Sequence, residues 1–501
     1  MPRFHFDNTY ARDLPGFYAE ARPAVAPAPQ LLYLNAALAE ALGLNVAALQ
    51  GDAGAQLFAG NALPEGAQPL AQAYAGHQFG GFSPQLGDGR ALLLGEVIDR
   101  QGQRRDIAFK GSGRTPYSRG GDGKAAVGPM LREVLISEGM HALGILTTRA
   151  LAVAATGEPV YREAAFPGAV LTRVAASHLR VGTFQYFAAR GDTDKLQRLA
   201  DYAINRHDPA LAGTPGRHVA FLRAVAQRQA RLVAQWLNVG FIHGVMNTDN
   251  MTISGETIDY GPCAFMEAYD PATVFSSIDR GGRYAYANQP LIARWNLARL
   301  AETLLPLMAS ADDEAAIGRA VAEVTEVIDA FPAWFATELL AGQRRKLGLQ
   351  QANDDAGDTT LVADWLALLK THQVDFTLAW RRLGDAAAAD ANPLRALFAE
   401  AAAVNPWLAR WQARCALEDA NQPAAAAERA TRMQATNPWL IPRNHRVEEA
   451  LAAASEHGDL GQFKQLLAAV QRPFDDNPAL VRYAEPAPAA LTAGYQTFCG
   501  T

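Results

Sequence analysis

One stretch of the chain, residues 241–261, constrains the fold more than any other. It reads Phe-Ile-His-Gly-Val-Met-Asn-Thr-Asp-Asn-Met-Thr-Ile, then a short turn, then Ile-Asp-Tyr-Gly. It follows residues 218–237, whose apolar side chains recur at helical spacing, and Gly240, which suits a helix end. Asn250 and Asp259 carry hard oxygen atoms, the donors that Mg²⁺ and Mn²⁺ prefer. The pattern predicts a loop after a long helix that holds one such ion together with nucleotide phosphates.

The same residues fit a protein-kinase catalytic loop with one change. In kinases an Asp lies five residues before the Asn, and a later Asp-Phe-Gly supplies the second metal ligand. His243-Gly244, Asn250 and Asp259-Tyr260-Gly261 fit this pattern, but Val245 occupies the position of the Asp. Valine cannot accept a proton, so the usual kinase base is missing. Asp249 is the nearby carboxylate in the loop, and it could act as a base or orient the groups that hold the metal.

Two residues upstream complete a kinase-like order of elements. Lys110 ends an apolar strand pattern at residues 106–110, where a kinase lysine would reach nucleotide phosphates. Glu133 lies on the next predicted helix, which begins near Gly128-Pro129, and its carboxylate could pair with that lysine. Glu138 competes for the same role but lies one turn further along. The order of strand lysine, helix glutamate, loop asparagine and turn aspartate favours the pairing of Lys110 with Glu133.

Two glycine-rich loops and two arginines could contact phosphates. Residues 85–90 contain Gly87 and Gly89 and end with Arg90, while residues 118–124 contain Asp122 and Gly123. Backbone amides in such loops can bind an anion, although neither loop is a GxGxxG or a P-loop. Arg173 on a predicted strand and Arg180 after it could bind phosphate through two hydrogen bonds each. Taken singly, each of these features is more often an ordinary turn or a surface arginine.

The pattern of elements predicts an α+β fold with a protein-kinase-like bilobal arrangement. A chain of 501 residues is longer than one hydrophobic core usually supports. We therefore expect a β-rich N-lobe with one key helix and a helical C-lobe, together with an N-terminal wrap and a helical C-terminal extension. The predicted parts are an N-terminal segment packed on the core (1–70), the N-lobe (71–185), the C-lobe with the catalytic loop (186–330), and the extension with its redox-capable tail (331–501).

Helix starts in the extension are predicted from Asn-Pro pairs. Asparagine can bind the free amides of a first turn, and proline fits the first helical position. Four such pairs occur after residue 390: Asn392-Pro393, Asn405-Pro406, Asn437-Pro438 and Asn477-Pro478. We expect a helix to begin at each of them.

Composition excludes some partners. The formal charge is −6, which argues against a nucleic-acid binder because phosphate contacts need a basic surface. The N-terminus has no apolar secretory signal, and no apolar run is long enough to span a bilayer. Cys263, Cys415 and Cys499 show no metal-ligand spacing and are too few for a disulfide framework. A reducing cytoplasm is the expected compartment, and the sequence does not specify an oligomeric state.

Longer motifs follow one another along almost the whole chain. They are Phe6-Asp7-Asn8 with Tyr10, Ala73–Gly80, Gln85–Arg90, Phe109–Pro116, Arg132-Glu133, Leu171–Ala175, Arg180–Phe184 and His243–Asn250. In these motifs the chain resembles the selenoprotein O (SelO) family of kinase-like protein adenylyltransferases. It is identified as a cysteine-containing, bacterial-type member of that family.

The resemblance implies that ATP is flipped relative to a kinase, so that its α-phosphate faces the acceptor. AMP would then pass to Ser, Thr or Tyr hydroxyls of protein substrates, and pyrophosphate would leave. The implied residue roles are polyphosphate binding by Lys110, Arg173 and Arg180; nucleotide contact by Gly87, Gly89, Arg90, Asp122 and Gly123; Mg²⁺ or Mn²⁺ binding by Asn250 and Asp259; and proton acceptance by Asp249.

The family's tail implies a redox control. Its selenium-containing members carry selenocysteine near the C-terminus, where this chain has Phe498-Cys499-Gly500-Thr501. A disulfide between the tail and the region after the metal-binding Asp is suggested for the family, and Cys263 is the candidate partner here. Two unlinked thiols, a packed Cys263 and a free Cys499, are the alternative.

Other functions fit the same residues. The absent Asp at position 245 is compatible with a pseudokinase scaffold that binds nucleotide without catalysis. Asp249 as base would suit a small-molecule kinase, although its offset from the usual position disfavours this. A nucleotidyltransferase that uses UTP is a further alternative to one that uses ATP.

Overall fold

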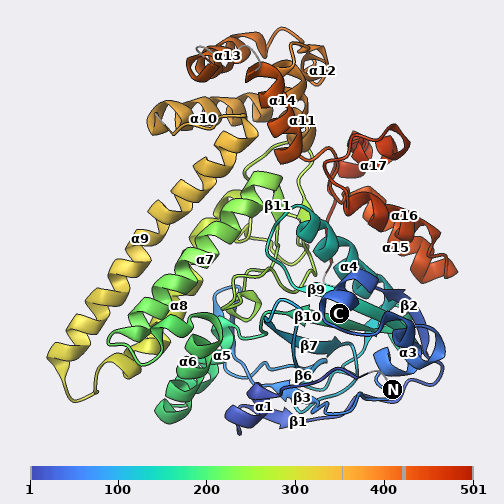
Figure 1. The fold of residues 1–501 in the computed structure, drawn as a ribbon, viewed down its shortest axis with the longest axis vertical. Coiled ribbons are helices and arrows are strands. Elements are labelled where there is room, and N and C mark those ends of the chain that lie inside the picture. Colours follow the sequence, from blue (N-terminus) through green and yellow to red (C-terminus); the bar gives the residue numbers. More distant parts are fainter. Residues whose placement is uncertain (1–2, 353, 420–424, 499–501) are drawn as a thin grey trace.

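An eight-stranded antiparallel sheet forms the lower part of the structure in the view of Figure 1. The computed structural model describes residues 3–352, 354–419 and 425–498. The strands lie in the order β1-β3-β6-β7-β10-β9-β2, and β8 pairs with β10. Their bounds are β1 Tyr18–Glu20, β2 Gln30–Leu34, β3 Leu70–Gln72, β6 Ala91–Ile98, β7 Arg104–Lys110, β8 Ala125–Ala126, β9 Arg149–Tyr161 and β10 Ala165–Ala175. Strands β6, β7 and β10 are largely buried, which is why short continuous apolar runs form them.

The first 70 residues form both edges of this sheet. Strand β1 pairs with β3 through Tyr18 and Gln72, and β2 pairs with β9 through Gln30 and Ala155. Helices α1 Thr9–Asp13, α2 Ala36–Ala41 and α3 Gly51–Phe58 lie between or beside these strands. The segment that the sequence predicts to pack on the core therefore contributes strands to the sheet itself.

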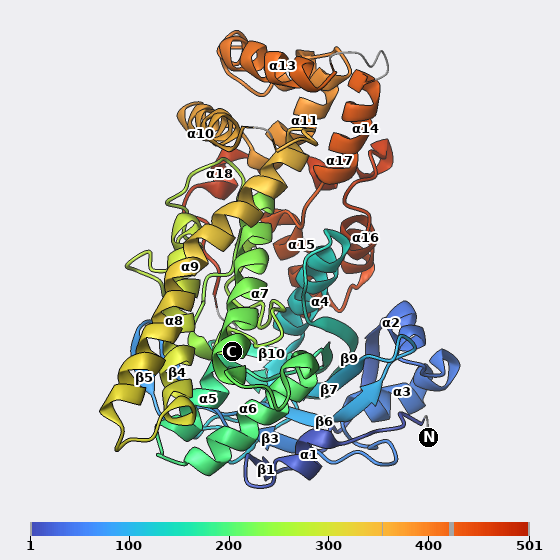
Figure 2. The same cartoon turned by 60° about the vertical axis from the view of Figure 1, so that its left-hand side comes forward.

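Helix α4, Val127–Ala142, packs between the sheet and the C-terminal helices. It contacts β9 and β10 on one side and α15 Asn444–His457 and α16 Gly461–Val470 on the other, as Figure 2 shows. Its side chains are buried around most of its circumference, which is typical of a helix inside a core. Even Glu133 and Glu138 are buried, so each carboxylate needs a cationic partner.

The helices after the sheet place the loop at residues 241–261. Helix α7, Arg217–Val239, matches the helix predicted over 218–237 and ends at Gly240, whose φ of 74° is the left-handed conformation of a helix C-cap. Strands β11 Phe241–Ile242 and β12 Ala264–Phe265 then pair and bracket the loop. Helices α8 Gln289–Met308 and α9 Glu314–Lys346 pack against α7, and α5 Val181–Ala188 and α6 Thr193–His207 contact α8. The loop therefore starts from a fixed helix end beside the sheet.

The remaining chain is helical, as predicted. Its elements are α10 Asp355–Thr371, α11 Phe376–Ala387, α12 Asn392–Arg395, α13 Asn405–Asp419, α14 Ala425–Thr436, α15, α16, α17 Val481–Ala484 and α18 Ala489–Thr492. Helices α12 and α13 begin at Asn392 and Asn405, and Asn477 caps a short 3₁₀ turn. The prediction of a helix start at Asn437 was wrong. Asn437 follows the end of α14, and its buried side-chain amide donates to the carbonyl of Lys346 at 2.9 Å.

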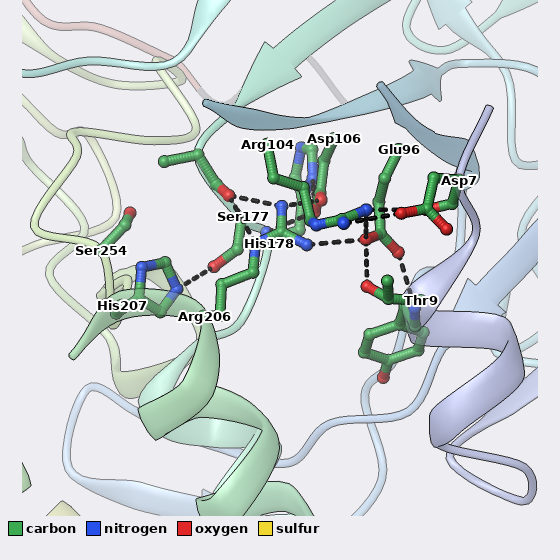
Figure 3. A network of polar contacts seen from close by, with 12 residues as sticks. Asp7, Thr9, Glu96, Arg104, Asp106, Ser177, His178, Arg206, His207 and Ser254 are labelled. Atoms are coloured by element: carbon green, nitrogen blue, oxygen red, sulfur yellow. Dashed lines mark hydrogen bonds and ion pairs between the residues drawn. The ribbon is translucent and has the colours of Figure 1, made fainter. Parts of the chain in front are cut away.

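A buried polar network fixes the sheet to helix α6 (Figure 3). Glu96 on β6 and Asp106 on β7 face each other in register, and both carboxylates are buried. Arg206 of α6 bridges them, with one Nη 2.9 Å from Glu96 and the other 2.6 Å from Asp106. Asp106 also accepts from the backbone and the ring of His178. Because each carboxylate has a cationic partner and further hydrogen bonds, the network can stay buried.

None of the helices in the described part of the chain combines the length and the apolar character that a bilayer span requires.

Arg443 joins the C-terminal helices to the loop region. Its side chain is fully buried and binds Asp375, the N-cap of α11, through two nitrogens at 2.6 and 3.0 Å. The same guanidinium lies 2.6 Å from Glu267 and donates to the carbonyl of Ala484. One cation thus bonds two carboxylates from different segments.

We predict that Arg443→Met lowers the free energy of unfolding by about 3–5 kcal/mol, because it leaves buried carboxylates uncompensated. The matched control is Arg410→Met, since Arg410 is an exposed arginine that pairs with an exposed Asp364. That change should cost less than about 1 kcal/mol. Urea denaturation followed by circular dichroism measures both variants. Equal midpoints for the two would contradict the role assigned to Arg443.

Candidate active site

Three cations surround the carboxylate of Asp259. Lys110 at the end of β7 and Arg173 on β10 place nitrogens 3.0 and 2.7 Å from Oδ1. Arg180, the residue before α5, lies 2.6 Å from Oδ2. Asp259 itself has φ of 62°, a left-handed conformation that is rare for a residue with a side chain. Such strain is often held in place at functional sites by the surrounding contacts.

Glu133 of α4 completes the cluster. Its carboxylate lies 2.5 Å from Lys110 and 3.1 Å from Arg173. Glu138, the other glutamate of α4, instead binds Arg149 through two hydrogen bonds. The cluster therefore has three cations and two carboxylates, with one positive charge in excess.

The electrostatics of the cluster keep Asp259 ionised. Burial alone would raise the pKa of its carboxyl, but the charges of Lys110, Arg173 and Arg180 outweigh burial and hold the pKa well below its usual range. The pKa of Glu133 is likewise lowered, since Lys110 and Arg173 outweigh its burial. Both carboxylates are thus available as permanent anions.

Hydrogen bonds, and not a carboxylate at position 245, fix the loop before Asn250. Val245 is buried, and its carbonyl accepts a hydrogen bond from Nδ2 of Asn250 at 2.9 Å. His243 is also buried, and its ring bonds the carbonyl of Ile258, directly before Asp259. These contacts connect the two ends of the loop and orient the Asn250 amide so that its oxygen is the atom left for a ligand.

Asp249 has a different environment from Asp259. Its carboxylate is almost fully buried, and Nε2 of Gln78 donates to Oδ2 at 3.2 Å. Burial raises the pKa of Asp249 to about 6, against the opposing charge of Arg180. Arg180 donates to the main-chain oxygen of Asp249 at 2.5 Å. Two aspartates that flank one arginine therefore have pKa values shifted in opposite directions.

The donor set suits a hard divalent cation bound to phosphate. Asp259 supplies a carboxylate that stays charged, and Asn250 supplies an amide oxygen to which no described residue donates a hydrogen bond. Mg²⁺ is commonly held by one or two protein oxygens, with substrate phosphates and water completing its shell. Within residues 3–352, 354–419 and 425–498, no cluster of three or more His, Cys, Asp or Glu side chains could hold a metal.

The first glycine-rich loop lies against the Tyr117 ring. A Cβ atom at Gly87 would lie 2.3 Å from that ring, and one at Gly89 would lie 2.9 Å from the Tyr117 carbonyl. Glycine is thus required by close packing at both positions. Arg90 is partly exposed, and its side chain makes no hydrogen bond or ion pair within the described ranges. The structure does not bring it into the Asp259 cluster.

The second glycine-rich loop also remains outside that cluster. Asp122 binds Arg162 of the β9–β10 turn through two nitrogens, at 2.8 and 3.0 Å. Gly123 has φ of 67° and packs against the backbone of Gly113, so a side chain would not fit there. The two loops are neighbours, because the hydroxyl of Ser118 donates a hydrogen bond to the carbonyl of Gly89.

Sequence reasoning missed several polar residues around the cluster. Asp88 is buried, and its carboxylate accepts from the backbone of Gln72 at 3.0 Å. Tyr74 stacks beneath the Arg180 guanidinium, 4.8 Å from its ring centroid. His178 accepts from Nε of Arg173 at 3.3 Å. Asp88 and Tyr74 lie in or beside the motifs that carry the family resemblance, which is the signal that could have identified them.

Cys263 follows Asp259 closely and is buried. Burial raises the pKa of its thiol to about 11. The preceding Pro262 accepts a hydrogen bond from the hydroxyl of Thr497, 2.6 Å away, so the C-terminal segment contacts this loop. Cys499 lies outside the described residues.

Comparisons with known proteins point to the same family over almost the whole chain. The family described as "Protein adenylyltransferase SelO" matches residues 2–471. A "Protein nucleotidyltransferase YdiU" of Chromobacterium violaceum is 62% identical over 488 residues, which cover 97% of this chain and 100% of that protein. Proteins of the same name from Rhizobium rhizogenes and Cereibacter sphaeroides are 58% and 59% identical; their matches cover 100% and 99% of this chain, and 97% and 100% of their own lengths.

These matches span the sheet, helix α4 and the loop that carries Asn250 and Asp259. The residues of the Asp259 cluster all lie within the range that the family matches. The chain is therefore a nucleotidyltransferase that belongs to the SelO family of protein adenylyltransferases.

Proposed function

We propose that this enzyme transfers AMP from ATP to Ser, Thr or Tyr hydroxyls of proteins, with a divalent metal and with ATP flipped relative to a kinase. The observation that carries this proposal is the convergence of Lys110, Arg173 and Arg180 on Asp259. Three buried cations held by only two carboxylates suit a polyphosphate with its metal. The order of strand, helix, loop and turn that presents them supports a kinase-like bilobal arrangement with the boundaries predicted from the sequence.

In this proposal the acceptor hydroxyl oxygen attacks the α-phosphorus. A bond forms from that oxygen to phosphorus, the bond to the bridging oxygen of the β-phosphate breaks, and pyrophosphate leaves. Asp249 takes the hydroxyl proton. Lys110, Arg173 and Arg180 neutralise the leaving pyrophosphate. Mg²⁺ or Mn²⁺ held by Asn250 and Asp259 would add positive charge at the phosphates. The glycine-rich loops with Gly87, Gly89, Arg90, Asp122 and Gly123 would line the nucleotide.

Labelled ATP tests which phosphorus reacts. The protein, Mg²⁺ and a dialysed cell extract are incubated with α-labelled or γ-labelled ATP, and α-labelled UTP runs in parallel. We expect label on protein from α-labelled ATP and none from γ-labelled ATP. Label from γ-labelled ATP alone would support a kinase instead. ATP-dependent thermal stabilisation without any transfer would support a nucleotide-binding scaffold.

Substituting each of the two aspartates should distinguish metal binding from proton transfer. We predict that Asp259→Asn abolishes metal-stimulated transfer, because it removes the charged ligand. Asp249→Asn should slow transfer by about 10²–10⁴-fold, the usual contribution of a general base. It should leave the affinity for an ATP analogue nearly unchanged. Single-turnover rates and calorimetric titration with α,β-methylene ATP measure the two effects. Equal losses of affinity in both variants would contradict this division of roles.

We also propose that Cys263 and Cys499 form a regulatory disulfide. The support is the contact of Thr497 with Pro262, which holds the C-terminal segment beside Cys263. Oxidised glutathione would accept the two electrons as the two thiols lose their protons and join. We expect oxidation to change activity and lower the free-thiol count by two in the parent. Cys499→Ala should abolish both effects, whereas the control Cys415→Ala should keep them. Identical responses in all three proteins would disprove the disulfide.

A further inference from the structure

A small hairpin of two strands, β4 Gly76–Gln78 and β5 Gly81–Ser83, is joined to the loop that carries Asp249. The backbone N–H of His77 donates to the hydroxyl of Thr248 at 2.7 Å, and that of Phe79 donates to the side chain of Asn247 at 3.1 Å. Phe79 adopts φ of 51°, a conformation that a bulky residue rarely holds without such contacts. The hairpin and the loop are thus fixed relative to each other.

The hairpin also makes the contact that orients the Asp249 carboxylate. Gln78 lies between the two anchored residues, and its amide donates to Oδ2. The other oxygen, Oδ1, is buried and has no hydrogen-bond partner anywhere in the described ranges. Leaving a buried acceptor unpaired costs about 1–3 kcal/mol, and more when it is charged. Such groups in native proteins call for an explanation, and a catalytic role is one.

The space around Oδ1 depends on Gly76. A Cβ atom at this position would lie 2.4 Å from Oδ1 and 2.9 Å from Cγ of Asp249. Its φ is not in the left-handed region, so backbone conformation does not demand glycine here. The requirement for glycine comes from the Asp249 carboxylate and from the side chain of Leu86, whose Cδ1 would lie 2.9 Å from a Cβ atom here.

We propose that Gln78 is a positioning residue that orients the Asp249 carboxylate for proton transfer, and that Gly76 keeps the space this orientation needs. The inference rests on the proposed function, in which Asp249 accepts the proton of the acceptor hydroxyl. Oδ2 is held by the amide and Oδ1 lies in the space that Gly76 leaves, so the hairpin sets the direction of the carboxylate.

The chemistry of the donor supports this assignment. A neutral amide fixes the direction of a carboxylate without adding a charge to the site. Arg180, the nearby cation, bonds the side chain of Asp259 but only the main chain of Asp249. The arginine thus bonds the side chain of Asp259, which would face the phosphates. The glutamine amide bonds the side chain of Asp249, which would face the acceptor hydroxyl.

A double-mutant cycle tests the role of Gln78. We expect Gln78→Leu to lower the single-turnover rate of α-label transfer about 10-fold, as loss of orientation does. The affinity for α,β-methylene ATP should stay within about twofold, because Gln78 makes no contact with the cation cluster. In an Asp249→Asn background the same change should have almost no effect, since the two residues act as one unit. The exposed Gln101→Leu serves as the matched control.

Two glycines of the hairpin provide a second test. Gly76→Ala should lower the rate by about 10-fold or more, because its methyl group displaces the carboxylate. Gly81→Ala should leave it within about twofold, since a Cβ there meets only the carbonyl of Gln78, at 3.5 Å. Thermal unfolding of every variant establishes that it is folded.

The outcomes separate the two hypotheses. If the wild type transfers α-label and Asp249→Asn does not, but Gln78→Leu matches the wild type, the positioning role is wrong and the proposed function stands. Equal losses from Gln78→Leu in both backgrounds, or a parallel loss of nucleotide affinity, would also overturn the positioning role. If Asp249→Asn transfers α-label as fast as the wild type, Asp249 is not the base and the positioning role fails with it, whereas AMP transfer stands. If the wild type transfers no α-label, the proposed function fails.

Discussion

The attraction between Asp259 and its three cations is the interaction on which the rest of the site depends. Lys110, Arg173 and Arg180 come from β7, β10 and the start of α5, and they would repel one another if no anion lay between them. Burying such charges is favourable only when they are paired and hydrogen-bonded. Contacts from β7 and β10 to the Asp259 side chain therefore hold its strained φ. The loop folds against the ends of those strands.

A continuous set of polar contacts carries this arrangement away from the site. Arg173 bonds His178, His178 bonds Asp106 on β7, and Asp106 bonds Arg206 of α6. Each charged group in the series is buried, so moving one leaves its partner uncompensated. A backbone hydrogen bond also fixes the segment that carries Arg180, because the N–H of Val181 donates to the carbonyl of Met251 in the loop. The sheet, helix α6 and the loop are thus fixed in position relative to one another.

Sequence reasoning predicted the elements whose local signals agree with their packing. Helix α7 shows an apolar stripe and a terminal Gly240, and strand β7 shows an apolar run that ends at Lys110. The predictions were less accurate where contacts between distant segments determine the structure. Asn437 has the residue pair of a helix start, yet its amide binds the carbonyl of Lys346, far away in sequence. Gln78 gave no signal of its own, because its role depends on a hairpin that folds back onto Asp249.

The two aspartates of the loop explain why Val245 need not be a defect. Asp259 lies among cations and stays ionised, as a metal and phosphate site requires. Asp249 is buried beside a neutral amide, and its pKa of about 6 is closer to neutrality, as a proton acceptor requires. When the environments of two carboxyl groups shift their pKa values apart, one group can serve as a ligand and the other as a base. An ionised carboxylate in place of the buried Val245 would be a further charge to compensate, whereas valine leaves the two roles that we propose to Asp259 and Asp249.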